Sequence, residues 1–295
     1  MSIRELKEYT TISKYAKYLP DEKRRENWNE CVDRVKGMML ERYKDCPEVH
    51  DDLNWAYEMM RKKRVLGSQR ALQFGGEPIL KRNLRLYNCI SSYVDRPRFF
   101  QESIYLLLCG CGVGFSVQNH HIGKLPNLVK SIDGEIKHVI EDSIEGWSDA
   151  VGALVCSYFD QKDIFPEYVG KNVRFDFTRI RAKGEKITSG GKAPGPEPLK
   201  KALREIRKIL SSAGGKKLRS IEAYDIIMHS ADAVISGGVR RSATTAIFSP
   251  DDNDMAKAKT GNWLAENPQR GRSNNSALLL RGETSPEQFS ALMKN

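Results

Sequence analysis

A cysteine on a predicted strand is the first residue of this chain whose type and setting suggest chemistry. Cys89 lies in residues 84–90, where leucine, leucine, asparagine and isoleucine recur at every second position, the period of a β-strand. A strand cysteine is most often a small buried apolar residue. Here Asn88 and Ser91 place polar groups beside the thiol, where a plain core strand would be apolar. On these residues alone, a packing role and a reactive thiol both stay open.

A glycine-rich turn follows the cysteine strand after one predicted helix. The helix begins at Asp95 and Pro97, because a side-chain acceptor and a residue without an N–H both suit an unpaired first turn. The run Gly-Cys-Gly-Val-Gly at residues 110–114 then opens a second strand. A dinucleotide fingerprint follows a strand and opens a helix, so this run does not indicate a Rossmann site. Gly112 and Gly114 instead let the backbone approach a flat ligand closely.

Two further segments are basic and rich in turn residues. Residues 178–192 carry their cations among glycines, a composition that suits a flexible cradle for a triphosphate. Residues 261–275, GNWLAENPQRGRSNN, form a second predicted basic loop. The plain alternative for both is a solvated run of charge. For Arg240 and Arg241, which follow a double glycine, cations at a helix end are the preferred explanation over an anion site.

No metal site is predicted. Cys109 and Cys111 form a single Cys-x-Cys without the second pair that structural zinc needs, so packing is the expected role. His120 and His121 stand in a predicted polar loop without carboxylate or cysteine spacing nearby, which is typical of surface residues.

The elements that must position these residues follow from hydrophobic periodicity. Residues 1–20 are polar and only loosely patterned, whereas residues 21–43 and 51–61 repeat at helical spacing. After residue 80, strands at 173–177, 243–248 and 277–280 alternate with helices that begin near Ser143, Pro198, Ser220 and Pro286. We therefore predict an α/β protein with a largely parallel sheet behind a helical N-terminal region.

Composition limits the cellular setting and the partners. The chain has 295 residues, a formal net charge of +10 and six irregularly spaced cysteines, which do not resemble a secreted disulfide framework. No stretch approaches a membrane span, and the polar first residues exclude a signal peptide. We expect a cytoplasmic protein without membrane contact, whose positive field attracts nucleic acid or the phosphates of nucleotides.

Taken in order, the motifs resemble the catalytic subunit of ribonucleotide reductase, most closely its adenosylcobalamin-dependent class and the monomeric branch of that class. The motifs are YNCISS, GCGVGFS, DSIEGW, FDFTRIRAKG, SGGKAPGPEPL, SGGVRRSA and RSNNSA. The resemblance covers most of the chain from about residue 15. It implies a helical cap over residues 1–80, then the first half of a ten-stranded α/β barrel with effector-binding loops over residues 81–295.

The resemblance also implies a role for the thiol. Cys89 would lie beneath the ribose and supply one of two reducing equivalents, becoming half of a disulfide as the 2′-hydroxyl leaves as water. Asn88, Gly112 and Gly114 would contact the substrate, with the base against the glycine turn. Ser68 would lie near the substrate phosphates or ribose, and an ordinary turn or cap residue is an equally good interpretation of it.

Regulatory residues are implied in the same way. The effector, a deoxynucleoside triphosphate that sets specificity, would bind Asp95, Arg179, Arg181 and Lys183, with Arg181 as the main phosphate ligand. The neighbouring loop would relay the identity of the effector to the substrate base through Gln269, Arg270 and Arg272.

Family motifs that are missing from this sequence predict the partners of the chain. The family's radical-forming cysteine, with its asparagine and glutamate, has no counterpart after Cys89. We expect an enzyme that is incomplete alone and pairs with a second polypeptide carrying the C-terminal half. Adenosylcobalamin, bound mainly by that half, is the expected radical source, and a separate metal subunit is the alternative. A thioredoxin-like external dithiol would renew the thiols, and the short segment between GCGVGFS and FDFTRIRAKG indicates a homodimer at the effector site.

The competing hypothesis is a basic nucleic-acid- or nucleotide-binding protein without catalysis. The charge and the arginine-rich loops motivate it. Aromatic residues do not alternate with the cations in either loop, however, so stacking on nucleic-acid bases is unsupported.

Overall fold

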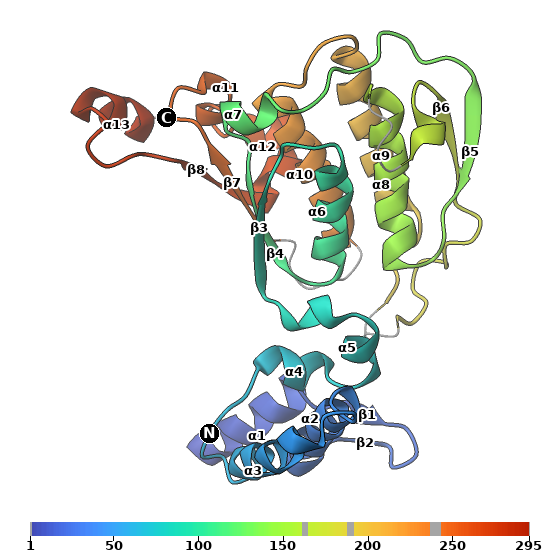
Figure 1. The fold of residues 1–295 in the computed structure, drawn as a ribbon, viewed down its shortest axis with the longest axis vertical. Helices are drawn as coiled ribbons and strands as arrows, with labels where there is room; N and C mark the ends of the chain where they lie inside the picture. The colour runs from blue at the N-terminus through green and yellow to red at the C-terminus, as the bar shows by residue number, and fades with distance from the viewer. Residues whose placement is uncertain (1, 161–164, 188–191, 237–242, 295) are drawn as a thin grey trace. The chain divides into compact units, whose positions relative to one another are not determined.

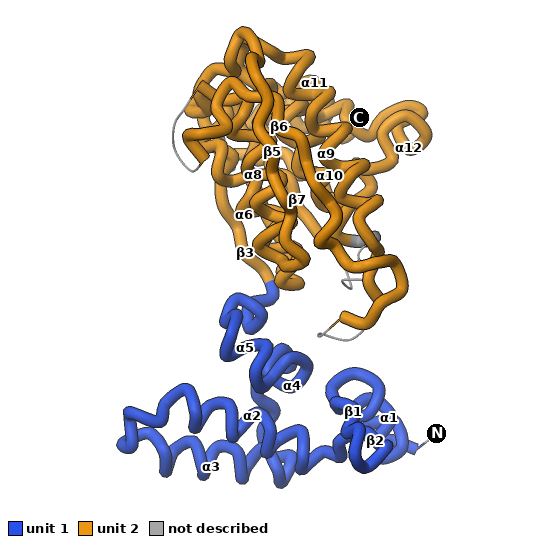
Figure 2. Tube along the Cα trace, turned by 90° about the vertical axis from the view of Figure 1, so that its right-hand side faces the viewer, with its two compact units in different colours: residues 1–88 blue, residues 89–295 orange. Residues whose placement is uncertain are grey.

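The computed structural model describes residues 2–160, 165–187, 192–236 and 243–294. Arg240 and Arg241 lie outside the described residues. The chain divides into two compact units, Met1–Asn88 and Cys89–Asn295, which Figure 2 colours separately.

The first unit is helical, with one small hairpin. Its elements are α1 (Ile3–Lys14), β1 (Tyr18–Leu19), β2 (Arg24–Arg25), α2 (Trp28–Arg42), η1 (Pro47–Val49), α3 (His50–Arg61), α4 (Gln69–Phe74), α5 (Glu77–Lys81) and η2 (Asn83–Leu86). The core lies between α2, α3 and α4, where Val32, Met60 and Leu72 are buried. The helices α2 and α3 fall within or close to the predicted ranges.

Two local predictions for this unit are wrong. Residues 1–20 contain α1, which begins at a capping box between Ser2 and Glu5 and buries none of its side chains. Its exposed residues Ile3, Leu6, Tyr9 and Ile12 recur at every third position, a helical spacing that the description as loosely patterned overlooked. Residues 83–86 form the 3₁₀ turn η2 instead of the first half of a strand.

The second unit is built on a four-stranded parallel sheet. Its strands are β3 (Cys89–Tyr93), β4 (Gly112–Ser116), β7 (Thr244–Phe248) and β8 (Ser273–Ala277), in the order β3-β4-β7-β8. Figure 1 shows the four strands side by side. The predicted parallel α/β architecture is therefore confirmed. The strand predicted at residues 277–280 is wrong, because β8 uses the polar run that precedes it.

Four helices lie on one side of this sheet, two in contact with its strands and two packed behind them. They are α6 (Arg98–Leu108), α8 (Ile144–Tyr158), α9 (Glu197–Ser212) and α10 (Ser220–Ser236). The core joins Phe99, Leu154 and Ile227 from the helices to Val113 and Phe115 of β4. The helix pairs α6/α8 and α9/α10 pack against each other, which Figure 1 shows beside the sheet. Ser143 caps α8 as predicted, with its side chain accepting from the N–H of Gly146.

Smaller elements complete the unit. They are α7 (Asn119–Ile122), the parallel ribbon of β5 (Glu135–Val139) and β6 (Asn172–Asp176), η3 (Pro166–Tyr168), α11 (Asn253–Ala256), α12 (Trp263–Glu266), η4 (Pro268–Arg272) and α13 (Pro286–Met293). The predicted basic loop at 261–275 is thus mostly helical turn and strand. None of the helices in the described ranges combines the length and the apolar character that crossing a bilayer requires.

Candidate functional site

One face of the four-stranded sheet is mostly polar, and it is exposed along the outer strands β3 and β8. Along β3, Cys89, Ser91 and Tyr93 are exposed, while the residues between them are half-buried. Strand side chains alternate between faces, and directly paired residues share a face. The ladder pairs therefore bring to this side Gly112, Gly114 and Ser116 of β4, Thr245 and Ile247 of β7, and Asn274 and Ser276 of β8. We call these seven residues, together with the three from β3, the open face.

Cys89 is the thiol that the open face displays. It begins β3, pairs with Gly112 of β4 and is exposed. The other cysteines are buried, apart from the half-buried Cys46. A thiol must reach its substrate to act as a reductant, and among the cysteines Cys89 has that access. Its exposure on the polar side of the sheet favours a reactive thiol over a packing role, and the reactive role stays a prediction.

The two candidate glycines lie on the same side of the central strand β4. A side chain at Gly114 would put its Cβ 3.4 Å from the Cβ of Ser91, and Gly112 is half-buried beside Cys89. Both therefore leave bare backbone next to the thiol. A flat group can approach such backbone closely, as predicted from the sequence.

The strand register places Arg272 in line with Cys89. Cys89 pairs with Gly112, while Val113 pairs with Thr244 and Thr244 with Ser273, so Arg272 stands one residue before β8 in the row that Cys89 begins. Three strand spacings of about 4.8 Å separate the ends of this row, roughly 14 Å. A nucleotide has a comparable length.

The arginines of η4 are already paired with carboxylates of α10. Arg270 donates to both oxygens of Asp225 at 2.8 and 2.6 Å, and Arg272 donates to Asp232 at 2.9 Å. Gln269 is buried and donates to Asp225 at 3.3 Å. Neither aspartate is among the site residues predicted from the sequence. Their spacing of seven residues on one helix was the available signal, because it places them on one helix face.

The predicted effector residues do not meet at one point. Arg179 pairs with Glu141, and Arg181 donates to Asp142 at 2.5 Å and to the carbonyl of Lys186 at 2.8 Å. Lys183 is exposed in the same loop. Asp95 follows β3 and accepts from Arg96 at 2.8 Å, and it is not the cap of α6, whose first turn follows Pro97. The structure therefore places Arg179 and Arg181 at the end of the β5–β6 ribbon, whereas Asp95 lies after β3 of the four-stranded sheet.

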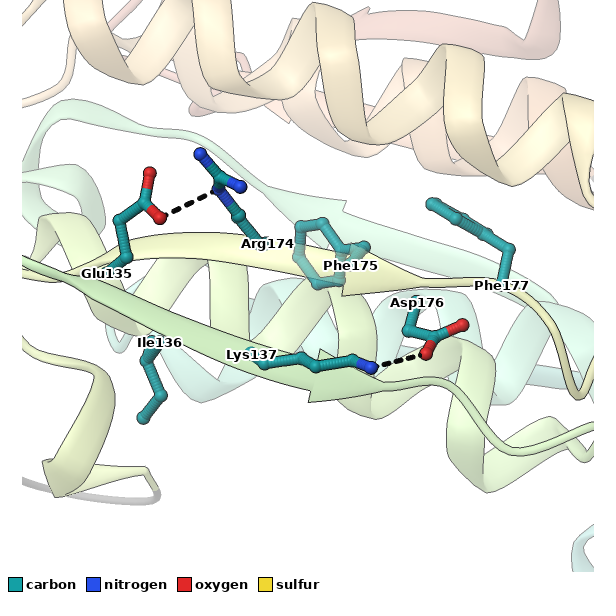
Figure 3. Close-up of a pocket in the computed structure, with 7 residues that line it drawn as sticks. All are labelled: Glu135, Ile136, Lys137, Arg174, Phe175, Asp176 and Phe177. Carbon is teal, nitrogen blue, oxygen red and sulfur yellow. Dashed lines mark ion pairs between the residues drawn. The ribbon is translucent and has the colours of Figure 1, made fainter.

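A groove of about 570 Å³ runs along the β5–β6 ribbon beside that loop. Figure 3 shows its two ion pairs, Glu135 with Arg174 and Lys137 with Asp176, at 2.8 and 2.7 Å. Hydrogen bonds from Lys137 and from Thr178 hold the pKa of Asp176 well below its usual range. These two ion pairs and Phe175 line the groove. Each of the four charged side chains there already has a partner of opposite charge.

Ser68 and Asn88 belong to the first unit. The hydroxyl of Ser68 accepts from the N–H of Ala71 at 3.2 Å and so caps α4, the ordinary role considered for it. The side chain of Asn88 accepts from Arg70 at 2.9 Å. Both side chains thus have contacts within their own unit.

An aromatic cluster that the sequence analysis missed lies at the far end of the open face. The ring of Tyr93 stacks on His121 with centroids 4.3 Å apart, and His121 meets the hydroxyl of Ser116 at 2.9 Å. His121 is buried in α7, so the prediction of a surface loop residue is wrong. Burial lowers the pKa of His121, and the charges of His120 and Lys124 lower it further. The sequence signal for Tyr93 was its position four residues after Cys89 on the same strand, which places both side chains on one face of the sheet.

No group of three or more His, Cys, Asp or Glu side chains within the described residues is arranged to hold a metal ion. What the open face offers is a thiol, hydroxyls, amides and bare backbone. Such a surface can donate a hydrogen atom or a proton, and it can bind a polar, flat ligand.

The chain is similar to one family of enzymes over most of its length. The family model described as B12-dependent ribonucleotide reductase, insertion domain, matches residues 122–210. The adenosylcobalamin-dependent ribonucleoside-triphosphate reductase of Lactobacillus helveticus (strain DPC 4571) is 30% identical over an alignment of 330 positions, gaps included, that covers 90% of this chain and 44% of that protein. A putative enzyme of the same description from Mycobacterium phage D29 is 30% identical over 279 residues, 79% of this chain and 38% of that protein.

A solved structure agrees with these relatives. A crystal structure of a B12-dependent (class II) ribonucleotide reductase superposes with a TM-score of 0.78 at 24% identity, over 92% of this chain and 45% of that one. The likeness confirms the expected fold, an α/β architecture consistent with half a barrel. The chain spans less than half the length of the relatives that it matches.

Proposed function

The chain belongs to the adenosylcobalamin-dependent ribonucleotide reductases, and on that premise we propose that it is the N-terminal part of a catalytic subunit that reduces ribonucleotides to deoxyribonucleotides by radical chemistry. Its relatives carry the name of ribonucleoside-triphosphate reductases, so triphosphates are the proposed substrates. The product would supply DNA replication, and we propose a cytoplasmic setting for the enzyme.

The exposure of Cys89 on the open face is the observation that carries this proposal. Its thiol and a cysteine of the other half each give up one hydrogen as they join in a disulfide, and the ribose 2′-hydroxyl leaves as water. An external dithiol of the thioredoxin type then reduces the disulfide, and the cycle restarts. The bare backbone at Gly112 and Gly114 gives the substrate room beside the thiol.

Adenosylcobalamin would supply the radical that starts the reaction. Its cobalt is held within the corrin ring, so the cofactor does not require a metal-ligand cluster in this chain. We assign its binding mainly to the other half of the subunit. A separate metal subunit as the radical source stays an alternative that the names of the relatives do not favour.

We propose a second polypeptide as the partner. The strand β8 ends the sheet order, and exposed apolar side chains follow it, Leu278, Leu280, Phe289 and Met293. An exposed strand edge beside apolar side chains is a surface that proteins normally cover. Further parallel strands from the other half would cover it.

A homodimer at the effector site stays a prediction, but the argument for it is weaker than the sequence suggested. That argument took the segment between GCGVGFS and FDFTRIRAKG to be too short for the insertion found in monomeric relatives, whereas the insertion-domain model matches residues 122–210. Within that range α8 and the larger part of α9 pack against α6 and α10 of the same chain.

We propose that an allosteric deoxynucleoside triphosphate binds near Arg179, Arg181 and Lys183. Arg179 and Arg181 pair with Glu141 and Asp142, so an entering triphosphate must exchange with these carboxylates. The same pairing weakens the alternative of a nucleic-acid-binding protein, because the arginines of both basic segments already have acidic partners.

Reconstitution tests the proposal. The chain is combined with a C-terminal half from a relative, adenosylcobalamin and dithiothreitol, and deoxyribonucleotide formation is followed over many turnovers. We expect activity from the mixture and from Cys46→Ala, which changes a half-buried thiol, and activity at background level from Cys89→Ala. Full multi-turnover activity of Cys89→Ala would remove the role that we assign to this thiol.

A further inference from the structure

Helix α10 presents two aspartates to the arginine-rich turn η4. Asp225 and Asp232 lie seven residues apart on α10, and each pairs with one arginine, Arg270 and Arg272 respectively. The two pairs differ in ways that assign them different roles.

The pair between Asp225 and Arg270 is the fixed one. Both side chains are only 13–14% exposed, the guanidinium makes two hydrogen bonds to the carboxylate, and it also donates to the carbonyl of Ala258 at 2.9 Å. Gln269 adds a further hydrogen bond to Asp225. Separating a buried pair leaves a charge without compensation, so this contact holds the turn in place.

The pair between Asp232 and Arg272 is exchangeable. Arg272 is 37% exposed and Asp232 22% exposed, so water can compensate both groups when they part. A second cation is also at hand, because the ammonium group of Lys201 on α9 lies 3.6 Å from the other oxygen of Asp232. Asp232 can therefore release Arg272 and keep an ionic partner.

Arg272 is the arginine that can reach the substrate. Arg272 is the residue directly before β8. By the strand register it lies in the row of paired residues that starts at Cys89. The end of a strand leaves a long side chain access to either face of the sheet. Arg270, by contrast, is held on the helix side by three hydrogen bonds.

We propose that Asp232 is a placeholder carboxylate for the phosphates of a nucleotide. It holds Arg272 until a ribonucleoside triphosphate arrives at the open face; the phosphates then take Arg272, and Asp232 passes to Lys201. Asp225 and Arg270 stay paired throughout and position the turn. The inference rests on the proposed function for the identity of the ligand, and it assigns the substrate contact to Arg272 instead of to both arginines.

Titration calorimetry of the full chain with ATP, and separately with inorganic tripolyphosphate, tests the placeholder. An Arg181→Ala background removes the proposed effector site from the signal. Asp232→Asn is expected to tighten binding roughly fivefold, the worth of one partly exposed ion pair. Arg272→Ala is expected to weaken binding, and Lys201→Met to weaken it as well, because the ammonium group that takes over Asp232 is then gone.

The control is Asp254→Asn, which removes one negative charge from an exposed pair with Arg219 elsewhere on the unit. An Asp232→Asn effect no larger than that of Asp254→Asn overturns the placeholder role, as does unchanged binding in Arg272→Ala. The calorimetric assay measures binding alone and does not require the reduction reaction to take place. If reconstitution yields no deoxyribonucleotide while Asp232→Asn still tightens ATP binding, the proposed function fails and the placeholder stands.

Discussion

Cys89 owes its potential reactivity to the residues around it on the open face. Ser91 and the glycines of β4 leave its thiol accessible, whereas Cys109 and Cys111 on nearby segments are buried. The same contrast holds for the arginines of η4. Arg270 is 14% exposed and makes three hydrogen bonds, whereas Arg272 is 37% exposed and donates to Asp232. At this scale, chemistry depends on access as much as on residue type.

Glu26 shows how a buried charge stabilises the first unit. It is 5% exposed, and Arg34 donates to its two oxygens at 2.7 and 2.9 Å, while the N–H of Lys17 donates at 2.9 Å. Burial alone would raise the pKa of Glu26, but the hydrogen bonds from Arg34 and Lys17 outweigh it and lower the pKa below its ordinary value.

We expect Glu26→Gln to lower the free energy of unfolding by about 3 kcal/mol at neutral pH, because it leaves the guanidinium of Arg34 buried without its counter-charge. The pKa is lower in the folded state, so the pair stabilises fully above the unfolded value of about 4.3 and is lost as the pH falls through the folded pKa. Urea denaturation from pH 7 to pH 3 measures both proteins. Their difference should shrink below about pH 4; a difference that stays constant down to pH 3 would contradict the assignment.

At the scale of elements, β4 connects the core to the site. Its Val113 and Phe115 are buried against the helices, while Gly112 and Gly114 face the open side. One strand thus serves two purposes, since alternation sends neighbouring residues to opposite faces.

We expect Gly114→Ala to keep the fold and to weaken nucleotide binding. The new Cβ would stand 3.4 Å from Ser91, an ordinary contact, and alanine weakens a strand no more than glycine does. The methyl group would occupy the surface that a flat ligand approaches. Thermal unfolding and ATP titration measure the two effects.

The control is Gly37→Ala on α2, where nothing lies within 4 Å of the new Cβ. It should raise stability by about 1 kcal/mol and leave binding unchanged. Equal ATP affinities for Gly114→Ala and the unsubstituted chain would show that this backbone does not contact the ligand.

At the scale of the whole molecule, the second unit is covered on one side of its sheet. Parallel sheets are usually covered on both faces. Here the helices bury one face, the open face is polar and exposed, and apolar side chains remain exposed beyond β8.

We therefore expect the chain alone to self-associate as its concentration rises, and to form a one-to-one complex when the C-terminal half is present. Sedimentation velocity over a wide range of concentrations measures this. Leu280→Lys with Phe289→Lys, which changes two exposed apolar residues, should reduce the self-association. A chain that is monomeric and well folded at every concentration would argue strongly against the missing partner.

Local rules allowed much of this architecture to be read from the sequence. Ser143 begins α8, Pro286 lies in the first turn of α13, and strands alternate with helices after residue 88, because caps, prolines and periodicity act over a few residues. The order of the motifs likewise pointed to the family. Cys89 and its glycine neighbours were named as candidates on the same evidence.

Only the tertiary structure decided which of the candidate side chains are available. Asp225 lies 45 positions from Arg270 in the sequence, and Asp232 lies 40 positions from Arg272. No local sequence pattern therefore links the members of either pair. The polar run Ser273–Ala277 becomes a strand because β7 pairs with it, although its own residues lack an apolar alternation. Pairing between distant segments determines such features, and the sequence of either segment alone does not contain it.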